Sequence, residues 1–200
     1  MTIFDTPLLS GLLHRVARGG LALSGWSIEG LPPDARRYVI IAAPHTSNWD
    51  LPFTLALGFA YRLKVTWMGK DTLFRAPFGI FFRWLGGLPI DRSRANDVVA
   101  RSVQHFRASE DLVVVVPPEG TRSRVRYWKT GFYWIAHGAG VPIALGFLDY
   151  RRKVGGFGPS IIPSGDIEAD MVHIRAFYAN VTGKHADATG AADVARPSLP

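Results

Sequence analysis

The chain has 200 residues, of which 48% are apolar, and a mean hydropathy of +0.09, which fits one globular domain with a sizeable core. A formal net charge of +7 favours anionic partners such as phospholipid headgroups, nucleotide-bearing molecules, acidic carrier proteins or nucleic acid. The absence of cysteine excludes disulfide bonds, thiolate metal sites and a cysteine nucleophile.

The first predicted element is a helix over residues 6–24, where leucine and valine recur near helical spacing and His14, Arg15 and Arg18 supply basic positions. Such a helix either anchors a protein at a membrane interface or docks on its own core. We assign residues 1–30 to a membrane-associating helical segment. No apolar stretch approaches the roughly 20 residues that span a bilayer, and the N-terminus lacks the pattern of a secretory signal. We therefore expect a peripheral protein at the cytoplasmic face of a membrane.

Strands and helices then alternate along the chain. Strands are predicted over residues 37–43, 64–68, 87–90, 112–116, 141–150 and 157–163, and helices over 49–60, 73–85, 96–108, 127–137 and 167–178. This order predicts a single α/β domain over residues 1–182. We expect a mostly parallel mixed sheet flanked by helices on both faces, with an N-terminal amphipathic helix. Residues 183–200, rich in Ala, Gly, Asp and Pro, are expected to form a disordered tail.

The first candidate for chemistry is the loop after the strand at 37–43, which reads Pro-His-Thr-Ser-Asn-Trp-Asp. Active sites of α/β proteins collect at the carboxyl ends of strands. His45 is able to face a pocket there, and Asp50 to accept a hydrogen bond from one imidazole nitrogen, which leaves the other nitrogen as a general base. The same residues also fit a helix cap and a core histidine, and the spacing alone is common.

A second charged loop follows the strand at 112–116 and contains Glu119, Gly120, Thr121 and Arg122. Gly120 permits a tight turn whose amides face an anion, and the guanidinium of Arg122 fits a phosphate bidentately. The alternative is a solvated loop with a surface ion pair between Glu119 and Arg122. The position of the loop at a second strand end favours the anion site.

Two shorter segments complete the set. Arg92 closes the apolar strand at 87–90, and taken alone it is typical of a solvated turn. Residues 141–143, Val-Pro-Ile, open a strand and carry no titratable group, so they only shape a wall.

In order and spacing, these four segments resemble the motifs of the glycerolipid acyltransferases, a family that includes the 1-acylglycerol-3-phosphate acyltransferases. That family has a His-x4-Asp motif, a glycine-rich block ending in Arg, a Pro-Glu-Gly-Thr-Arg block and a strand with Val-Pro. All four occur here in that order between residues 44 and 146. His-x4-Asp together with Glu-Gly-Thr-Arg is a specific combination, whereas either motif alone is not.

The resemblance implies that His45 removes the proton of an acceptor hydroxyl while Asp50 orients the imidazole. The oxygen then attacks the thioester of acyl-CoA or acyl carrier protein at a membrane surface, without a metal or a bound cofactor. The phosphate of a lipid acceptor such as lysophosphatidate is implied to bind at a set of loop residues: Arg92, Glu119, Gly120, Thr121 and Arg122.

The chain departs from the family pattern in four places, several of them near the acceptor loops and none at the catalytic pair. Pro44 precedes His45, Pro117 stands where phenylalanine is usual, the Arg92 block lacks its phenylalanine, and no second proline follows Ile143. The acceptor is therefore left open, with a glycolipid or a lyso-ornithine lipid as alternatives.

Two other classes of protein fit parts of the sequence. A thioesterase would use the same His-Asp pair with water in place of the alcohol, whereas a serine esterase is disfavoured because Gly-x-Ser-x-Gly is missing. A nucleic-acid-binding module fits the charge. However, the basic residues crowd two loops beside buried strands and no known nucleic-acid motif is present, so we expect no nucleic-acid partner.

Overall fold

The computed structural model describes residues 2–91 and 95–194. Within this part of the chain, seven strands form one sheet in the order β1-β7-β6-β2-β5-β3-β4. Neighbouring strands are parallel except β6 and β7, which are antiparallel. In chain order the strands are β1 (Ser27–Glu29), β2 (Arg37–Ala43), β3 (Val65–Lys70), β4 (Gly87–Ile90), β5 (Leu112–Val116), β6 (Ile143–Asp149) and β7 (Val154–Ile161).

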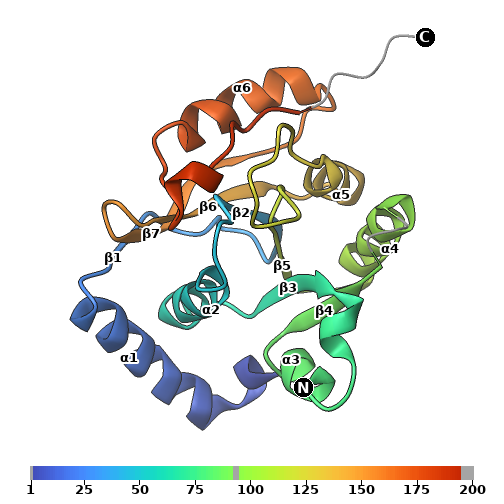
Figure 1. Cartoon of the computed structure of the whole chain (residues 1–200). Helices are drawn as coiled ribbons and strands as arrows, with labels where there is room; N and C mark the ends of the chain where they lie inside the picture. Colours follow the sequence, from blue (N-terminus) through green and yellow to red (C-terminus); the bar gives the residue numbers. More distant parts are fainter. Residues whose placement is uncertain (1, 92–94, 195–200) are drawn as a thin grey trace.

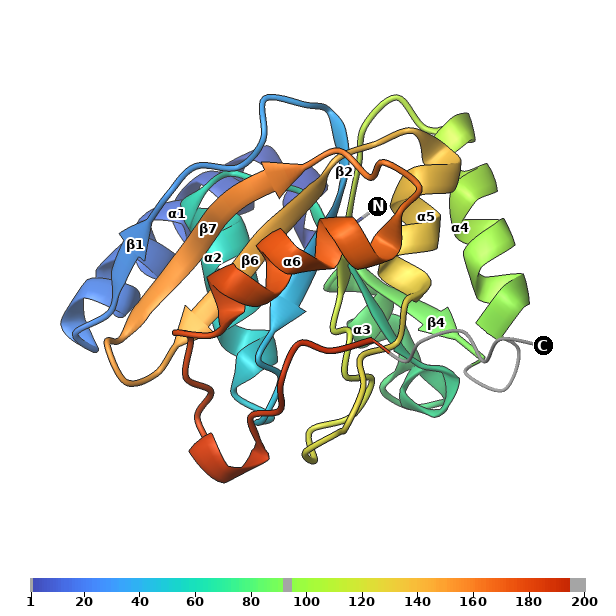
Figure 2. The same cartoon turned by 90° about the horizontal axis from the view of Figure 1, so that it is seen from above.

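Helices cover both faces of this sheet. The α-helices are α1 (Pro7–Leu23), α2 (Asp50–Ala60), α3 (Gly79–Trp84), α4 (Ala95–Ala108), α5 (Gly131–Ala139) and α6 (Ile167–Tyr178), and the short 3-10 helices are η1 (Ile3–Asp5), η2 (Asp71–Phe74) and η3 (Ala186–Ala188). Figure 1 shows α5 and α6 on one face, with α4 beside α5, and α2 and α3 on the other. From above, α6 lies across the middle of the sheet (Figure 2). The predicted single α/β domain is confirmed.

The central strand β2 shows why its sequence is almost continuously apolar. Val39 and Ile41 are buried in the core beneath α5 and α6, whereas Tyr38 and Ile40 are buried in the core on the α2 side. Side chains alternate along a strand, so a sheet covered on both faces needs apolar residues at every position. The chain then leaves the sheet at Pro44, where the site begins.

Two predicted helices have different bounds in the structure. The helix expected over residues 73–85 is divided into η2, which ends at Phe74, and α3, which begins at Gly79. Pro77 lies between them, and proline lacks the backbone N–H that a continuous helix requires. The helix expected over 127–137 begins only at Gly131, because Trp128 pairs with Val194 instead. It ends at Ala139, before Gly140 in the left-handed conformation.

Of the tail expected to be disordered, residues 183–194 pack on the domain, and residues 195–200 lie outside the described residues. Ala192 and Val194 are buried, and the N–H of Trp128 donates to the carbonyl of Asp193 at 2.7 Å. The N–H of His185 donates to the hydroxyl of Thr46 at 3.2 Å. The composition of this segment suggested disorder. It is ordered by contacts with distant parts of the chain, which composition does not reveal.

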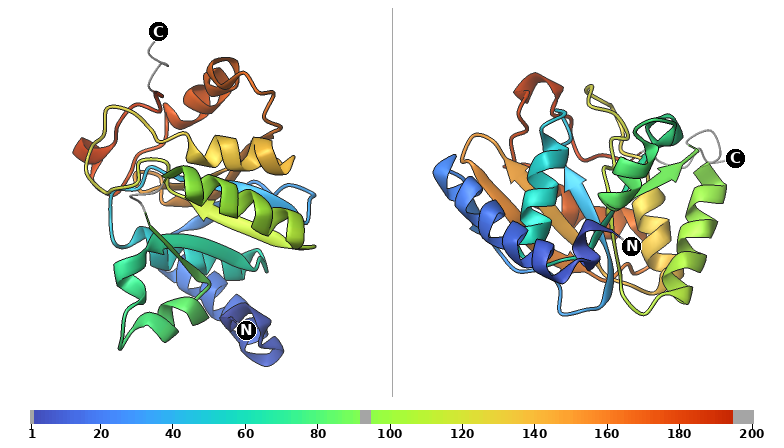
Figure 3. Two further views of the ribbon diagram at one scale, coloured as in Figure 1. Left: turned by 90° about the vertical axis from the view of Figure 1, so that its right-hand side faces the viewer. Right: turned by 90° about the horizontal axis from the view of Figure 1, so that it is seen from below.

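Helix α1 forms an outer layer over α2. Its Leu21 is buried near Trp26, but four of its apolar side chains are more than half exposed: Leu8, Leu12, Val16 and Leu23. Helix α3 also exposes Phe78 at its start and Ile80 within it. Figures 1 and 3 (left panel) place α1 and α3 at the same end of the molecule. In the described part of the chain, no helix is long and apolar enough to span a bilayer.

Candidate active site

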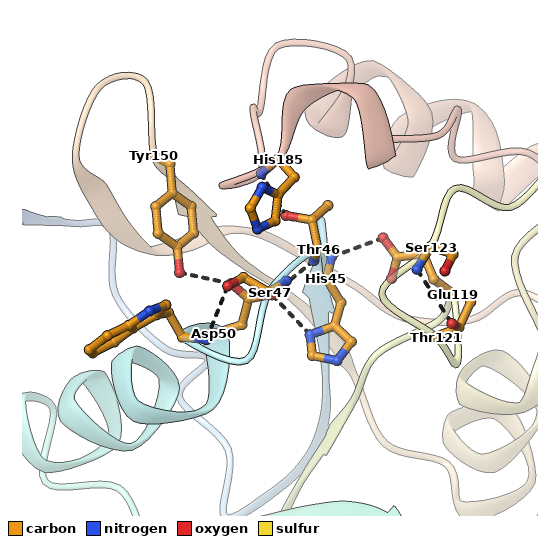
Figure 4. A network of polar contacts seen from close by, with 10 residues as sticks. His45, Thr46, Ser47, Asp50, Glu119, Thr121, Ser123, Tyr150 and His185 are labelled. Atoms are coloured by element: carbon orange, nitrogen blue, oxygen red, sulfur yellow. Dashed lines mark hydrogen bonds and ion pairs between the residues drawn. The ribbon is translucent and has the colours of Figure 1, made fainter.

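Parallel pairing brings the candidate loops to one edge of the sheet. Strands β2, β5 and β6 are neighbours that run in the same direction, so their carboxyl ends meet. His45 follows β2, Glu119 follows β5 and Tyr150 follows β6. Figure 4 shows these side chains converging on Asp50 and its loop.

His45 and Asp50 form the pair expected from the sequence. The imidazole Nδ1 of His45 lies 3.0 Å from Oδ2 of Asp50. The same oxygen accepts the backbone N–H groups of Thr46 and Ser47, each at 2.9 Å. The N-cap position of α2 is occupied by Trp49, and Asp50 is the first residue inside the helix. The alternative in which Asp50 is only a helix cap therefore does not describe its contacts. Because Nδ1 is engaged by Asp50 and His45 lines a cavity, Nε2 is the nitrogen that can meet a substrate.

Asp50 has a fourth donor that the sequence did not suggest. The hydroxyl of Tyr150 donates to Oδ1 of Asp50 at 2.8 Å, across 100 residues of chain. Burial raises the pKa of the Asp50 carboxyl, but the hydrogen bonds from His45, from the Ser47 amide and from Tyr150 outweigh it, so the pKa lies below its usual value. Burial and the neighbouring Asp50 raise the pKa of Tyr150, so its hydroxyl keeps its proton and acts as a donor.

Glu119 lies behind the His45 peptide. Its side chain is buried, at 6% exposure, and Oε1 accepts the backbone N–H of His45 at 3.1 Å. Burial raises the pKa of this carboxyl, and its Oε2 has no hydrogen-bond partner among the described residues. This geometry differs from the alternative of a surface ion pair with Arg122. Glu119 instead ties the loop after β2 to the loop after β5.

One cavity of about 380 Å³ opens between these loops. From the predicted site residues, its lining includes His45, Asp50, Gly120, Thr121 and Arg122. Gly120 has a φ of 66°, a backbone conformation that favours glycine, and a side chain there would press on Lys129. The remaining predicted residue, Arg92, lies outside the described residues.

The rest of the cavity is mostly apolar and follows one face of α2. Its residues from this helix recur three or four positions apart, which is the spacing of a single helical face: Asp50, Leu51, Thr54, Leu57 and Gly58. Tyr61 follows directly after α2 and also lines the cavity, as do Trp67 and Phe157 on the sheet side. Helix α2 has 11 residues. At a rise of about 1.5 Å per residue, the part of α2 that lines the cavity, from Asp50 to Gly58, is roughly 12 Å long.

Sequence reasoning missed Tyr150, Lys70 and Thr72. Lys70, the last residue of β3, and Thr72 just after it line the cavity, and Tyr150 donates to Asp50 just after β6. The available signal was their position at or just after the carboxyl end of a parallel strand, which is where the other motifs also lie. In the described part of the chain, no group of three or more His, Asp or Glu side chains is arranged to hold a metal ion.

The fold is shared with a glycerolipid acyltransferase. The structure resembles the crystal structure of the 1-acyl-sn-glycerophosphate (LPA) acyltransferase PlsC from Thermotoga maritima, with a TM-score of 0.57 and 16% sequence identity. The likeness covers 86% of this chain and 76% of that one. At this identity it shows a common architecture.

The sequence match then establishes the family. Residues 28–144 match the family model described as Acyltransferase, and the chain belongs to this family. A 1-acyl-sn-glycerol-3-phosphate acyltransferase of Streptococcus pneumoniae is 27% identical over 122 residues, which make up 56% of this chain. The matched region spans 45% of that relative's length. The family resemblance seen in the sequence is confirmed.

Proposed function

We propose that this protein transfers a fatty acyl group from an acyl thioester to a hydroxyl of a phosphate-bearing lipid such as lysophosphatidate, with His45 as general base. The observation that carries this proposal is the His45–Asp50 pair, joined at 3.0 Å, at the mouth of an elongated apolar cavity. Membership of the acyltransferase family supports the same chemistry.

The proposed reaction proceeds in one addition and one elimination. Nε2 of His45 takes the proton of the acceptor hydroxyl as its oxygen attacks the thioester carbonyl carbon. The Asp50 carboxylate stabilises the resulting imidazolium through Nδ1. The carbon–sulfur bond then breaks, the thiolate leaves, and the imidazolium proton passes to the sulfur. Atoms and charges balance with protein side chains alone, so we propose no metal and no bound cofactor.

The cavity along α2 suits the acyl chain. It is lined mainly by aliphatic and aromatic side chains, and its wall on α2 is roughly 12 Å long, from Asp50 to Gly58. An alkyl chain removed from water gains free energy in proportion to its buried apolar area, about 25 cal/mol per Å². His45 lies at the polar end of this cavity, where the thioester of the donor would meet the acceptor.

The loop after β5 suits the acceptor phosphate. Thr121 and Arg122 both line the cavity, and Arg122 is exposed at its edge. A guanidinium binds a phosphate through two parallel hydrogen bonds, which fixes orientation as well as charge. By the family resemblance we include Arg92 in this site. A glycolipid or lyso-ornithine lipid acceptor remains the alternative.

We further propose that the protein works as a peripheral protein at the cytoplasmic face of a membrane. The exposed apolar side chains of α1 and α3 lie at one end of the molecule, and Arg15 and Arg18 of α1 are exposed nearby in the chain. Apolar and cationic groups together bind an anionic lipid surface. The partners of this proposal are acyl-CoA or acyl carrier protein, the lipid acceptor and the membrane, with no nucleic acid.

The test is a product analysis with defined donors and acceptors. The purified protein is given acyl-CoA and acyl carrier protein donors with lysophosphatidate, a glycolipid and lyso-ornithine lipid in vesicles, and products are identified by mass spectrometry. We expect a new ester on a phosphate-bearing acceptor, and no ester with His45→Ala of unchanged thermal stability. Free fatty acid released equally fast with and without acceptor would contradict transfer and support the thioesterase.

A further inference from the structure

The carboxylate of Asp50 is held from two sides. Three N–H donors, from His45 and from the peptides of Thr46 and Ser47, meet at Oδ2. Oδ1 accepts the hydroxyl of Tyr150, which lies outside the residues 28–144 matched by the family model. We infer that Tyr150 is a positioning residue that fixes the Asp50 carboxylate against His45. This inference rests on the proposed acyl transfer.

The geometry gives the hydroxyl a specific task. The terminal torsion of an aspartate side chain is broad, so the rotamer itself does not fix the carboxylate plane and the hydrogen bonds must do so. The donors at Oδ2 all come from one loop, and Tyr150 adds an anchor at the other oxygen from a distant part of the chain. In Figure 4, Tyr150 approaches Asp50 from the side opposite to His45. The bond from Tyr150 and the donors at Oδ2 together fix the plane in which Oδ2 meets the imidazole.

Tyr150 is itself held rigidly. Its ring makes edge contacts with Trp26, at a centroid distance of 5.0 Å, and with Phe53, at 5.9 Å. Its backbone N–H donates to the carbonyl of Thr182 at 2.9 Å. Because both ring and backbone are fixed by packing, the hydroxyl is preorganised to meet Asp50.

The charged groups around the Asp50 carboxylate come from its own loop and from two other parts of the chain. His45 lies on the same loop, and the buried Glu119 comes from the loop after β5. The ammonium of Lys184 lies 5.7 Å from the Tyr150 ring centroid and 5.3 Å from that of Trp49. The charge of Asp50 is one cause that raises the pKa of Glu119, so an ionised Glu119 disfavours an ionised Asp50 in turn. His185, the next residue, is tied through its backbone to the Thr46 hydroxyl.

Tyr150 does not belong to the lining of the cavity, although Asp50 and His45 do. A substrate in the cavity therefore meets His45 and not the Tyr150 hydroxyl. Removing that hydroxyl should slow the chemical step and leave substrate binding unchanged, which distinguishes positioning from a role in the binding site.

The test compares Tyr150→Phe with wild type and with a matched control. Tyr133→Phe removes a tyrosine–aspartate hydrogen bond of the same length, 2.8 Å, from Tyr133 to Asp170 between α5 and α6. For Tyr150→Phe we expect a roughly tenfold or greater loss of kcat, because hydrogen bonds to charged groups are the stronger ones. The KM values for donor and acceptor should not change. Tyr133→Phe should keep the wild-type kcat even if its thermal stability falls.

A second readout does not depend on activity. The carboxyl carbon of Asp50 is followed by NMR during a pH titration of all three proteins. Loss of the Tyr150 donor should raise the pKa of Asp50, and the acidic limb of the kcat profile should move to higher pH in Tyr150→Phe only. If the wild type transfers no acyl group but Tyr150→Phe still raises the pKa of Asp50, the proposed function is overturned and the contact between Tyr150 and Asp50 is retained. An unchanged titration with kcat within about twofold of wild type would overturn the inference about Tyr150.

Discussion

The substitution Asp50→Asn tests the proposed mechanism most directly, because it removes a charge and keeps the shape. The amide oxygen of the new side chain can take the place of Oδ2 and accept from His45, Thr46 and Ser47. Its amide nitrogen then faces the hydroxyl oxygen of Tyr150, which is able to accept a hydrogen bond. The loop should therefore keep its structure and the protein should fold.

The loss of activity can be worked from the distance between the two side chains. At 3.0 Å and an effective dielectric constant of about 20, an imidazolium and a carboxylate attract each other by about 5.5 kcal/mol. The imidazolium forms as the acceptor hydroxyl loses its proton, so this attraction stabilises the transition state more than the ground state. At about 1.4 kcal/mol per factor of ten, the substitution should lower kcat by up to about 10⁴-fold.

The assay measures ester formation under saturating donor and acceptor, with thermal unfolding of both proteins as the control for folding. KM values should stay close to those of wild type, because the attraction acts mainly on the imidazolium. A variant that folds normally and retains kcat within about tenfold of wild type would refute the role of the Asp50 charge.

Four further predictions concern the surroundings of this pair. Glu119→Ala should destabilise the protein by about 1–3 kcal/mol in chemical denaturation, because the partly buried N–H of His45 loses its acceptor. Glu119→Gln, which keeps an acceptor oxygen, should be closer to wild type, and equal losses in both variants would count against the contact. Arg122→Ala should raise the KM for the phosphate-bearing acceptor and leave the donor KM unchanged; an unaltered acceptor KM would remove Arg122 from the phosphate site. Thr54→Phe should fill the middle of the cavity along α2, so kcat/KM should fall for long acyl donors and persist for short ones, with Thr54→Ser as the control. Leu12→Glu places a charge on the exposed apolar side of α1 and should reduce co-sedimentation with anionic vesicles, whereas unchanged sedimentation would exclude this part of α1 from the docking face.

Much of the fold followed from local patterns. The alternation of apolar strands and helices predicted the α/β sheet, since a strand covered on both faces must be apolar throughout, as Val39, Ile40 and Ile41 are. The position of His45 and Glu119 just after two such strands predicted that they would meet at one edge of the sheet. The bounds of the helices were harder to predict. Pro77 and Gly140 lie close to helix ends in the structure, but whether such a residue ends a helix depends also on contacts with the rest of the chain.

The sequence by itself determined the kinds of side chain in the site and their places at the ends of strands, because periodicity and short motifs are properties of neighbouring residues. Only the tertiary structure decided which distant groups complete that site. Tyr150 reaches Asp50 across 100 residues, Glu119 holds the backbone of His45 across 74, and His185 binds Thr46 of the same loop across 139. Such contacts arise because the order of the strands in the sheet brings the ends of β2, β5 and β6 together. The residues that meet there share no sequence pattern that would reveal the contact.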